Sequence, residues 1–95
     1  RHPMPRKFMI EREIPGVGQL DSCALAEASR NSNAALAQVG PGIQWQQSYV
    51  TGDRTYCVYL AESEDLIRKH AELSGFPASK IVEIKDVIDP ATALR

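Results

Sequence analysis

The strongest constraint on the fold is the stretch 42–62, GIQWQQSYVTGDRTYCVYLAE, in which two β-rich runs flank a short turn. Gly52 and Asp53 lie at the centre of that turn, and both residue types are typical of tight connections between strands. Residues 43–51 and 54–61 are therefore predicted to form a β-hairpin. Because side chains alternate across a strand, the hairpin also divides its residues between the two faces of a sheet.

Four further elements are predicted from signals of the same kind. Proline ends a strand because it cannot donate to the ladder, and helices begin after a capping side chain and end at glycine. The elements are a strand at 7–14, a helix capped by Asp21 or Ser22 and ended at Gly40, a helix between Ser63 and Gly75, and a strand at 80–88. The complete order is βαββαβ.

Right-handed crossovers fold this order into a ferredoxin-like α+β domain, a four-stranded antiparallel sheet with both helices on one face. The first and third strands are then central neighbours, and the other sheet face is bare. A chain of 95 residues buries little surface by itself, so we expect a second copy to cover that face in a homodimer. We assign 5–90 to this single domain, 91–95 to a short tail and 1–3 to vector remnant.

The composition is that of a soluble globular protein and argues against two classes of partner. With 11 basic and 12 acidic residues, the chain lacks the basic excess expected of a nucleic-acid-binding surface. Neither an apolar run of roughly 20 residues nor a signal-peptide hydrophobic region is recognisable, so no membrane partner is expected. The two cysteines, Cys23 and Cys57, fit a reduced cytoplasmic protein.

With a tight turn, the hairpin side chains separate into a more apolar and a more polar set. The apolar set, assigned to the helix-covered face, comprises Trp45, Gln47, Tyr49, Tyr56, Val58 and Leu60. The polar set, assigned to the bare face, includes Gln46, Ser48, Cys57 and Tyr59. Glu11 and Glu13 of the first strand are expected beside this polar set, while Phe8 and Ile10 face the helices. A bulge or a three-residue turn would invert the hairpin half of the assignment.

Two carboxylates on a central strand, Glu11 and Glu13, are the most unusual polar feature. A buried carboxylate needs a partner. The pair would therefore serve as metal ligands or as a general base with a raised pKa, or would form salt bridges with Lys7, Lys85 or a residue of a second protomer. The salt bridge is the more economical interpretation.

Other side chains could also contribute to a site. Cys57 could bind a soft metal as a thiolate, although its position in mid-strand suits packing as a small hydrophobic residue. His70 lies at the edge of the apolar stripe of the second helix, where a half-buried structural histidine is expected and a metal ligand would need companions. The residues expected to bind a small ligand are Gln46, Ser48 and Tyr59, with the tyrosine hydroxyl orienting it.

Three stretches resemble a known family: ERE, SYVTGDRTYCVYLAE and RKHAELSGFPASKIVEIKDVIDP. Over residues 7–90 the chain is similar to small bacterial domains of unknown function that include a nickel-binding protein. The resemblance implies a dimeric ferredoxin-like α+β barrel and a divalent transition metal such as nickel as cofactor. Cys57 and His70 match family positions. The nickel-binding relatives carry histidines in place of the ERE segment and of Phe76. This departure argues against nickel itself, because a site built on carboxylates would favour harder metals.

We therefore expect a non-catalytic dimeric protein that binds a metal ion or a small molecule. The metal ligands would come from Glu11, Glu13, Cys57 and His70. Fold analogy offers a second hypothesis, a small dimeric-barrel enzyme of monooxygenase or isomerase type that acts on an apolar organic ligand. A third is a purely structural or interaction module, in which the bare sheet face only makes the dimer.

Overall fold

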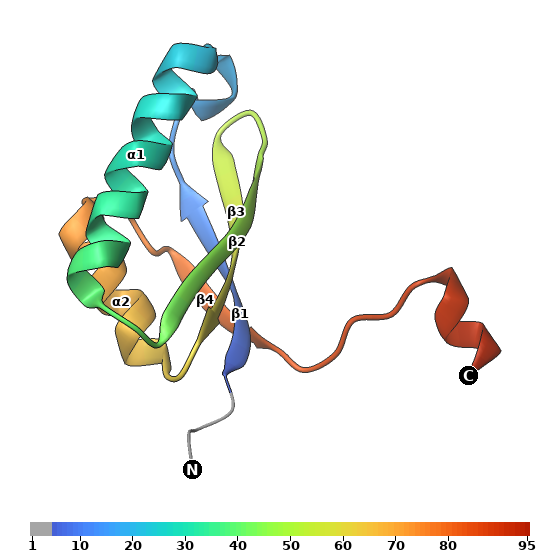
Figure 1. Cartoon of the computed structure of the whole chain (residues 1–95). Helices are drawn as coiled ribbons and strands as arrows, with labels where there is room; N and C mark the ends of the chain where they lie inside the picture. The colour runs from blue at the N-terminus through green and yellow to red at the C-terminus, as the bar shows by residue number, and fades with distance from the viewer. Residues whose placement is uncertain (1–4) are drawn as a thin grey trace.

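The computed structural model describes residues 5–95, so the prediction that residues 1–3 are vector sequence lies outside the described residues. Six main elements follow one another in the predicted order (Figure 1). They are β1 (Arg6–Glu13), α1 (Ser22–Val39), β2 (Ile43–Val50), β3 (Arg54–Ala61), α2 (Glu64–Ser74) and β4 (Lys80–Ile84). Two short 3-10 helices, η1 (Val17–Gln19) and η2 (Pro90–Leu94), lie after β1 and near the C-terminus.

The strands are arranged in the order β2-β3-β1-β4, and all neighbouring strands are antiparallel. Both helices cover one face of the sheet, and the other face is open (Figure 1). Because strand–helix–strand crossovers are right-handed, β1 and β3 become the central neighbours. The predicted ferredoxin-like α+β fold is confirmed. Neither helix in the described part of the chain is long and apolar enough to span a membrane.

The helix ends lie at the predicted capping residues. Asp21 precedes α1, and its Oδ1 accepts a hydrogen bond from the backbone N of Ala24 at 2.9 Å, which satisfies one of the donors exposed at a helix start. Gly75 follows α2 with a φ of 76°, a left-handed conformation that favours glycine. Ser63 precedes α2 as predicted, but its side chain makes no capping hydrogen bond within the described chain.

The hairpin has the predicted register beside its turn and departs from it farther away. Tyr49 lies opposite Tyr56, as a tight turn at Gly52 and Asp53 requires. Between Trp45 and Gln47 a β-bulge inserts one extra residue, so that Trp45 lies opposite Tyr59 instead of Leu60.

The predicted faces of β3 are wrong. On β1, Ile10 lies opposite Cys57 and Phe8 lies opposite Tyr59, and residues opposite one another share a face. These four side chains pack in the core beneath the helices, together with Ala61 of β3 and Ile67 of α2. Because β3 carries apolar side chains on both faces, alternation by itself could not decide which face turns inward. The pairing with β1 decides it.

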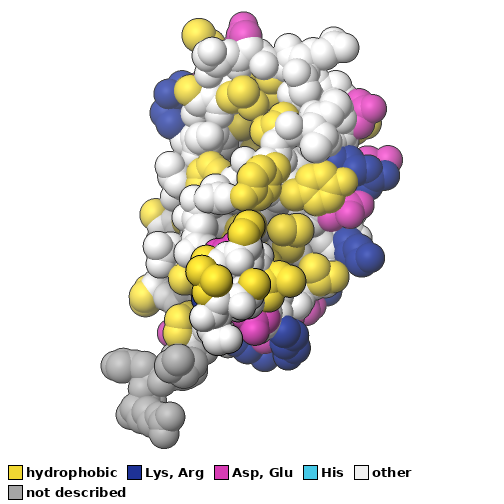
Figure 2. Space-filling model, turned by 90° about the vertical axis from the view of Figure 1, so that its right-hand side faces the viewer, with side chains coloured by type: hydrophobic (Ala, Val, Ile, Leu, Met, Phe, Trp, Pro, Cys, Tyr) yellow, Lys and Arg dark blue, Asp and Glu magenta, His cyan; other side chains and the backbone are white. Residues whose placement is uncertain are grey.

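The open sheet face keeps exposed apolar side chains. Val82 of β4 is 43% exposed and Tyr49 of β2 is 54% exposed on this face, whereas Met9 is half-buried and Val58 is buried beside them. Figure 2 shows hydrophobic side chains gathered over the sheet, with charged side chains gathered toward one edge. The unpaired face predicted from the βαββαβ order is therefore present in the single chain.

The last strand is shorter than predicted, because β4 ends at Ile84 and not at residue 88. The following segment extends away from the domain as an arm that ends in η2 (Figure 1). Three of its apolar side chains, Val87, Ile88 and Leu94, are 59%, 78% and 88% exposed. The arm therefore presents apolar surface that its own domain does not cover.

Candidate functional site

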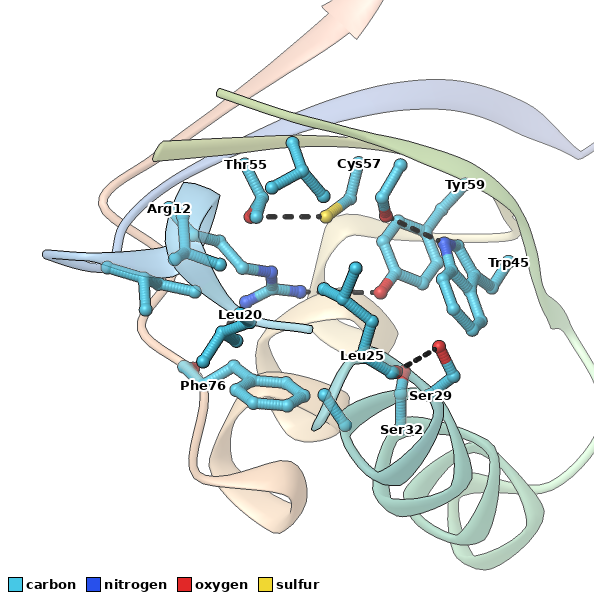
Figure 3. Close-up of a pocket in the computed structure, with 15 residues that line it drawn as sticks. Arg12, Leu20, Leu25, Ser29, Ser32, Trp45, Thr55, Cys57, Tyr59 and Phe76 are labelled. Atoms are coloured by element: carbon cyan, nitrogen blue, oxygen red, sulfur yellow. Dashed lines mark hydrogen bonds between the residues drawn. The ribbon is translucent and has the colours of Figure 1, made fainter. Parts of the chain in front are cut away.

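A cavity of about 140 Å³ lies between α1 and the helix-covered face of the sheet (Figure 3). Leu25, Ser29 and Ser32 line it from α1, and Cys57 and Tyr59 line it from β3. Leu20 and Phe76, from the connections after η1 and α2, close the side opposite β3. The walls are mostly apolar, with a small number of hydroxyl groups and one guanidinium.

The loop between β1 and α1 forms part of the wall because it is bonded to the turn of the hairpin. The backbone N of Gly18 donates to the carbonyl of Gly52 at 3.0 Å, and the backbone N of Gly16 donates to Oδ1 of Asp53 at 2.9 Å. A Cβ on Gly18 would lie 2.6 Å from the carbonyl oxygen of Thr51, so only glycine allows this approach. The contact holds η1 against the cavity.

Arg12 supplies the charged group of the site, although its side chain is only 2% exposed. It follows Phe8 and Ile10 on the inward face of β1. Its Nη1 donates to the carbonyl oxygen of Pro77 at 2.6 Å and to that of Phe76 at 3.5 Å, and Nη2 donates to the hydroxyl of Tyr59 at 3.4 Å. No ion pair among residues 5–95 includes Arg12, because the salt bridges there are formed by other arginines and by Lys85.

Arg12 is not among the site residues predicted from the sequence. The two-residue period of the strand indicates that Arg12 faces inward, because Phe8 and Ile10 were assigned to the helix side and Arg12 is the next residue on that side. A charged side chain that continues an inward stripe is a candidate for a buried functional group.

Tyr59 and His70 form a buried aromatic pair behind the guanidinium, with ring centroids 5.4 Å apart. Burial raises the pKa of Tyr59 above its usual value, so its hydroxyl stays protonated at neutral pH. Burial also lowers the pKa of His70, and the charge of Arg12 adds to that effect. His70 is fully buried, not half-buried as predicted.

The contact between His70 and Ser32 resembles a catalytic base with its nucleophile, but the hydrogen bonds argue against that role. His70 Nε2 lies 3.2 Å from Oγ of Ser32 and 3.3 Å from the carbonyl oxygen of the same residue. A carbonyl oxygen can only accept, so Nε2 carries a hydrogen and cannot take the hydroxyl proton. The pair therefore holds α1 against α2.

The residues predicted from the sequence lie in different places. Ser48 and Tyr59 line the cavity together with Cys57, whereas Gln46 lies at the bulge and is exposed. Glu11 and the neighbouring Glu13 lie on the open face of the sheet, on the other side from Cys57 and His70. The expectation that these groups share one surface is wrong, because β3 turns Cys57 inward.

The carboxylates on the open face form salt bridges within the chain. Glu11 Oε2 lies 2.5 Å from Nη1 of Arg54, and Glu13 Oε1 lies 4.0 Å from Nη2. The more economical interpretation from the sequence therefore holds for this face, but the partner is Arg54 and not Lys7 or Lys85. Glu13 lies directly opposite Arg54 in the β1–β3 pairing, which explains the partnership.

A preformed nickel site does not fit the described residues of one chain. No group of three or more His, Cys, Asp or Glu side chains in residues 5–95 is arranged to hold a metal ion. Nδ1 of His70 is buried and has no hydrogen-bond partner in the described chain, but a single nitrogen is not a coordination site. Cys57 Sγ is hydrogen-bonded to Oγ1 of Thr55 at 3.6 Å. The assignment of Glu11, Glu13, Cys57 and His70 as metal ligands stays a prediction.

Comparison with known proteins gives one family and one solved structure. A family model described as "Nickel responsive protein SCO4226-like" matches residues 8–84. The crystal structure of SCO4226 from Streptomyces coelicolor A3(2) superposes with a TM-score of 0.72 at 19% identity, covering 86% of this chain and 99% of that chain. At this identity the likeness shows the shared fold. None of the curated proteins matches the chain.

Proposed function

Because the chain belongs to the SCO4226-like family of nickel-responsive proteins, we propose that it is a non-catalytic, homodimeric binding protein that holds a small organic molecule between α1 and the sheet. The observation that carries this proposal is the cavity of about 140 Å³, in which a buried guanidinium and a tyrosine hydroxyl lie beside apolar walls. Binding sites for small molecules are typically concave and mostly apolar, with a small number of well-placed polar groups.

The volume of the cavity limits the size of the ligand. An engineered cavity of about 150 Å³ with apolar walls binds benzene, whereas sites for drug-sized ligands occupy roughly 300–1,000 Å³. A cavity of about 140 Å³ therefore suits a molecule with one ring or an equally compact aliphatic group. Nucleotide and flavin cofactors are too large for it.

A second copy of the chain is the proposed cover for the open sheet face. Val82 exposes 43% of its surface there, and the arm exposes Val87, Ile88 and Leu94 still more. Apolar side chains left exposed on an unpaired sheet face and on an extended arm are typical of an interface. An arm that extends away from its own domain suits packing on a partner, so the face and the arm together support a homodimer.

Nickel is the second ligand to test, because it is part of the family's description. One chain brings no three suitable ligands together within residues 5–95, so a nickel site would draw on groups from a second protomer. Glu11 and Glu13 lie on the face that such a protomer would cover. We expect calorimetric titration with Ni²⁺ to give weaker binding to Glu11→Gln than to the wild type. Equal affinity in both proteins would exclude Glu11 as a ligand.

Binding of single-ring compounds, both neutral and anionic, tests the small-molecule proposal by ligand-observed NMR. Ala28 lines the cavity from α1, and Ala28→Leu should fill it without disturbing the helix, because leucine is a good helix former. Ala26→Leu is the matched control, since Ala26 lies on the exposed side of the same helix.

We expect compounds that bind the wild type and Ala26→Leu to lose binding to Ala28→Leu. If no compound binds the wild type at millimolar concentration, the proposal of a small-molecule site is wrong. If Ala28→Leu binds as well as the control, the ligand site lies elsewhere on the protein.

A further inference from the structure

The guanidinium of Arg12 lacks a negative partner in the described chain. All the acceptors it meets, the carbonyl oxygens of Phe76 and Pro77 and the hydroxyl of Tyr59, are uncharged. Its Nε donates no hydrogen bond within residues 5–95, and the side chain lines the cavity. The protein therefore keeps one positive charge at the wall of a mostly apolar pocket, with hydrogen-bonding capacity unused.

Burial of a charge is unfavourable unless the charge is paired. Neutral acceptors offset only part of the desolvation cost, which is several kcal/mol per ion after relaxation. Arginine also presents its donors in a planar fork that matches the two oxygens of a carboxylate. A bound carboxylate would therefore supply the opposite charge and use the donors that remain.

The rest of the cavity indicates what the anion would carry. Val17, Leu20 and Leu25 line it with aliphatic side chains, and Phe76 adds an aromatic ring (Figure 3). One cation suits an anion with a single charge. Phosphate and sulfate dianions would require more donors or cations than this apolar lining offers. The body of the ligand should therefore be apolar and compact.

We propose that the cavity binds a small organic monocarboxylate, with its carboxylate on the guanidinium of Arg12 and its apolar body against Leu20, Leu25 and Phe76. This inference rests on the proposed small-molecule site and names the ligand class. The hydroxyl of Tyr59 accepts from Arg12 and keeps a hydrogen that it can donate to a carboxylate oxygen. Because Tyr59 stays protonated at neutral pH, it adds a donor without adding a negative charge.

Benzoate and benzamide form the decisive pair of probes, because they have nearly the same shape and differ in charge. Calorimetric titration at low salt should show benzoate binding to the wild type at least tenfold more tightly than benzamide, a difference of about 1.4 kcal/mol. Ala26→Leu should retain this preference, and Ala28→Leu should lose the binding of both compounds. In Arg12→Lys, which keeps the charge but not the planar fork, the preference for benzoate should fall severalfold.

The possible results separate this inference from the proposal on which it rests. Equal binding of benzoate and benzamide would overturn the carboxylate assignment while leaving a small-molecule site in place. Failure of both compounds to bind at millimolar concentration would overturn both. Inorganic phosphate that competes with benzoate at equal concentration would show a general anion site and would also overturn the inference. These comparisons use the wild type, so they stand even if Arg12→Lys does not fold.

Discussion

The contact between the loop after β1 and the hairpin turn makes a sharp prediction for Gly18→Ala. A Cβ on Gly18 would lie 2.6 Å from the carbonyl oxygen of Thr51 and 2.9 Å from Cα of Gly52, and both are backbone atoms that cannot rotate away. Ordinary contact begins at 3.4 Å, so the loop or the turn must retreat by roughly 0.8 Å. The 3.0 Å hydrogen bond from Gly18 N to Gly52 O would lengthen as well.

Three effects set the size of the change. Overpacking typically costs about 1–3 kcal/mol, and a lost hydrogen bond costs about 0.5–1.5 kcal/mol. Replacement of glycine by alanine recovers about 0.4–1 kcal/mol through the unfolded chain. We therefore expect Gly18→Ala to lower the free energy of unfolding by about 2 kcal/mol, which in a domain of this size lowers Tm by roughly 8–16 °C.

Gly52→Ala is the matched control, because it lies on the other side of the same contact. A Cβ on Gly52 meets nothing within 4 Å, and the backbone there has a φ that alanine can adopt. Its Tm should equal or slightly exceed that of the wild type. Thermal unfolding followed by circular dichroism measures both variants. Equal Tm values for Gly18→Ala and Gly52→Ala would refute the argument that the close approach requires glycine.

Three other perturbations test separate parts of the structure. Val82→Glu should shift the protein from dimer to monomer by light scattering, whereas Leu73→Glu, equally exposed but on α2, should not; a dimer in both would place the interface elsewhere. Burial lowers the pKa of His70 below the value of about 6.5 that it has in the unfolded chain. The free energy of unfolding is therefore unaffected by this group above that pH, and it falls by up to about 1.4 kcal/mol per pH unit as the pH drops below it. Urea unfolding should show a flatter pH dependence for His70→Gln between pH 7 and 5, and identical slopes would contradict the burial argument. Glu11→Gln should cost less than about 1 kcal/mol, and less at high salt, because its bridge to Arg54 is partly exposed; a larger loss would indicate a second role for Glu11.

Much of the fold could be predicted from local chemistry. The turn at Gly52 and Asp53 fixed the pairing of the hairpin near the turn, and Asp21 and Gly75 marked helix ends, because each conformation depends on neighbouring residues only. The extra residue in the bulge has no comparable signature in the sequence. The pairing of Trp45 with Tyr59 could therefore be foreseen only as the alternative in which a bulge changes the register.

The candidate site was predicted in part. Ser48, Cys57 and Tyr59 share a cavity, as their alternation along the hairpin indicated. The sequence could not place that cavity under α1, because both faces of β3 carry apolar side chains and a period of two residues does not distinguish inside from outside.

The sequence by itself therefore determined the order of the elements, the helix ends and, on the turn side of the bulge, the two sets of side chains on the hairpin, since these follow from local backbone preferences and periodicity. Only the tertiary structure decided which set faces the helices, through the pairing of Cys57 with Ile10. That choice buries Arg12 beside Tyr59 and leaves Glu11 with Arg54 on the open face. The physical reason is that burial and charge pairing depend on contacts between strands distant in sequence.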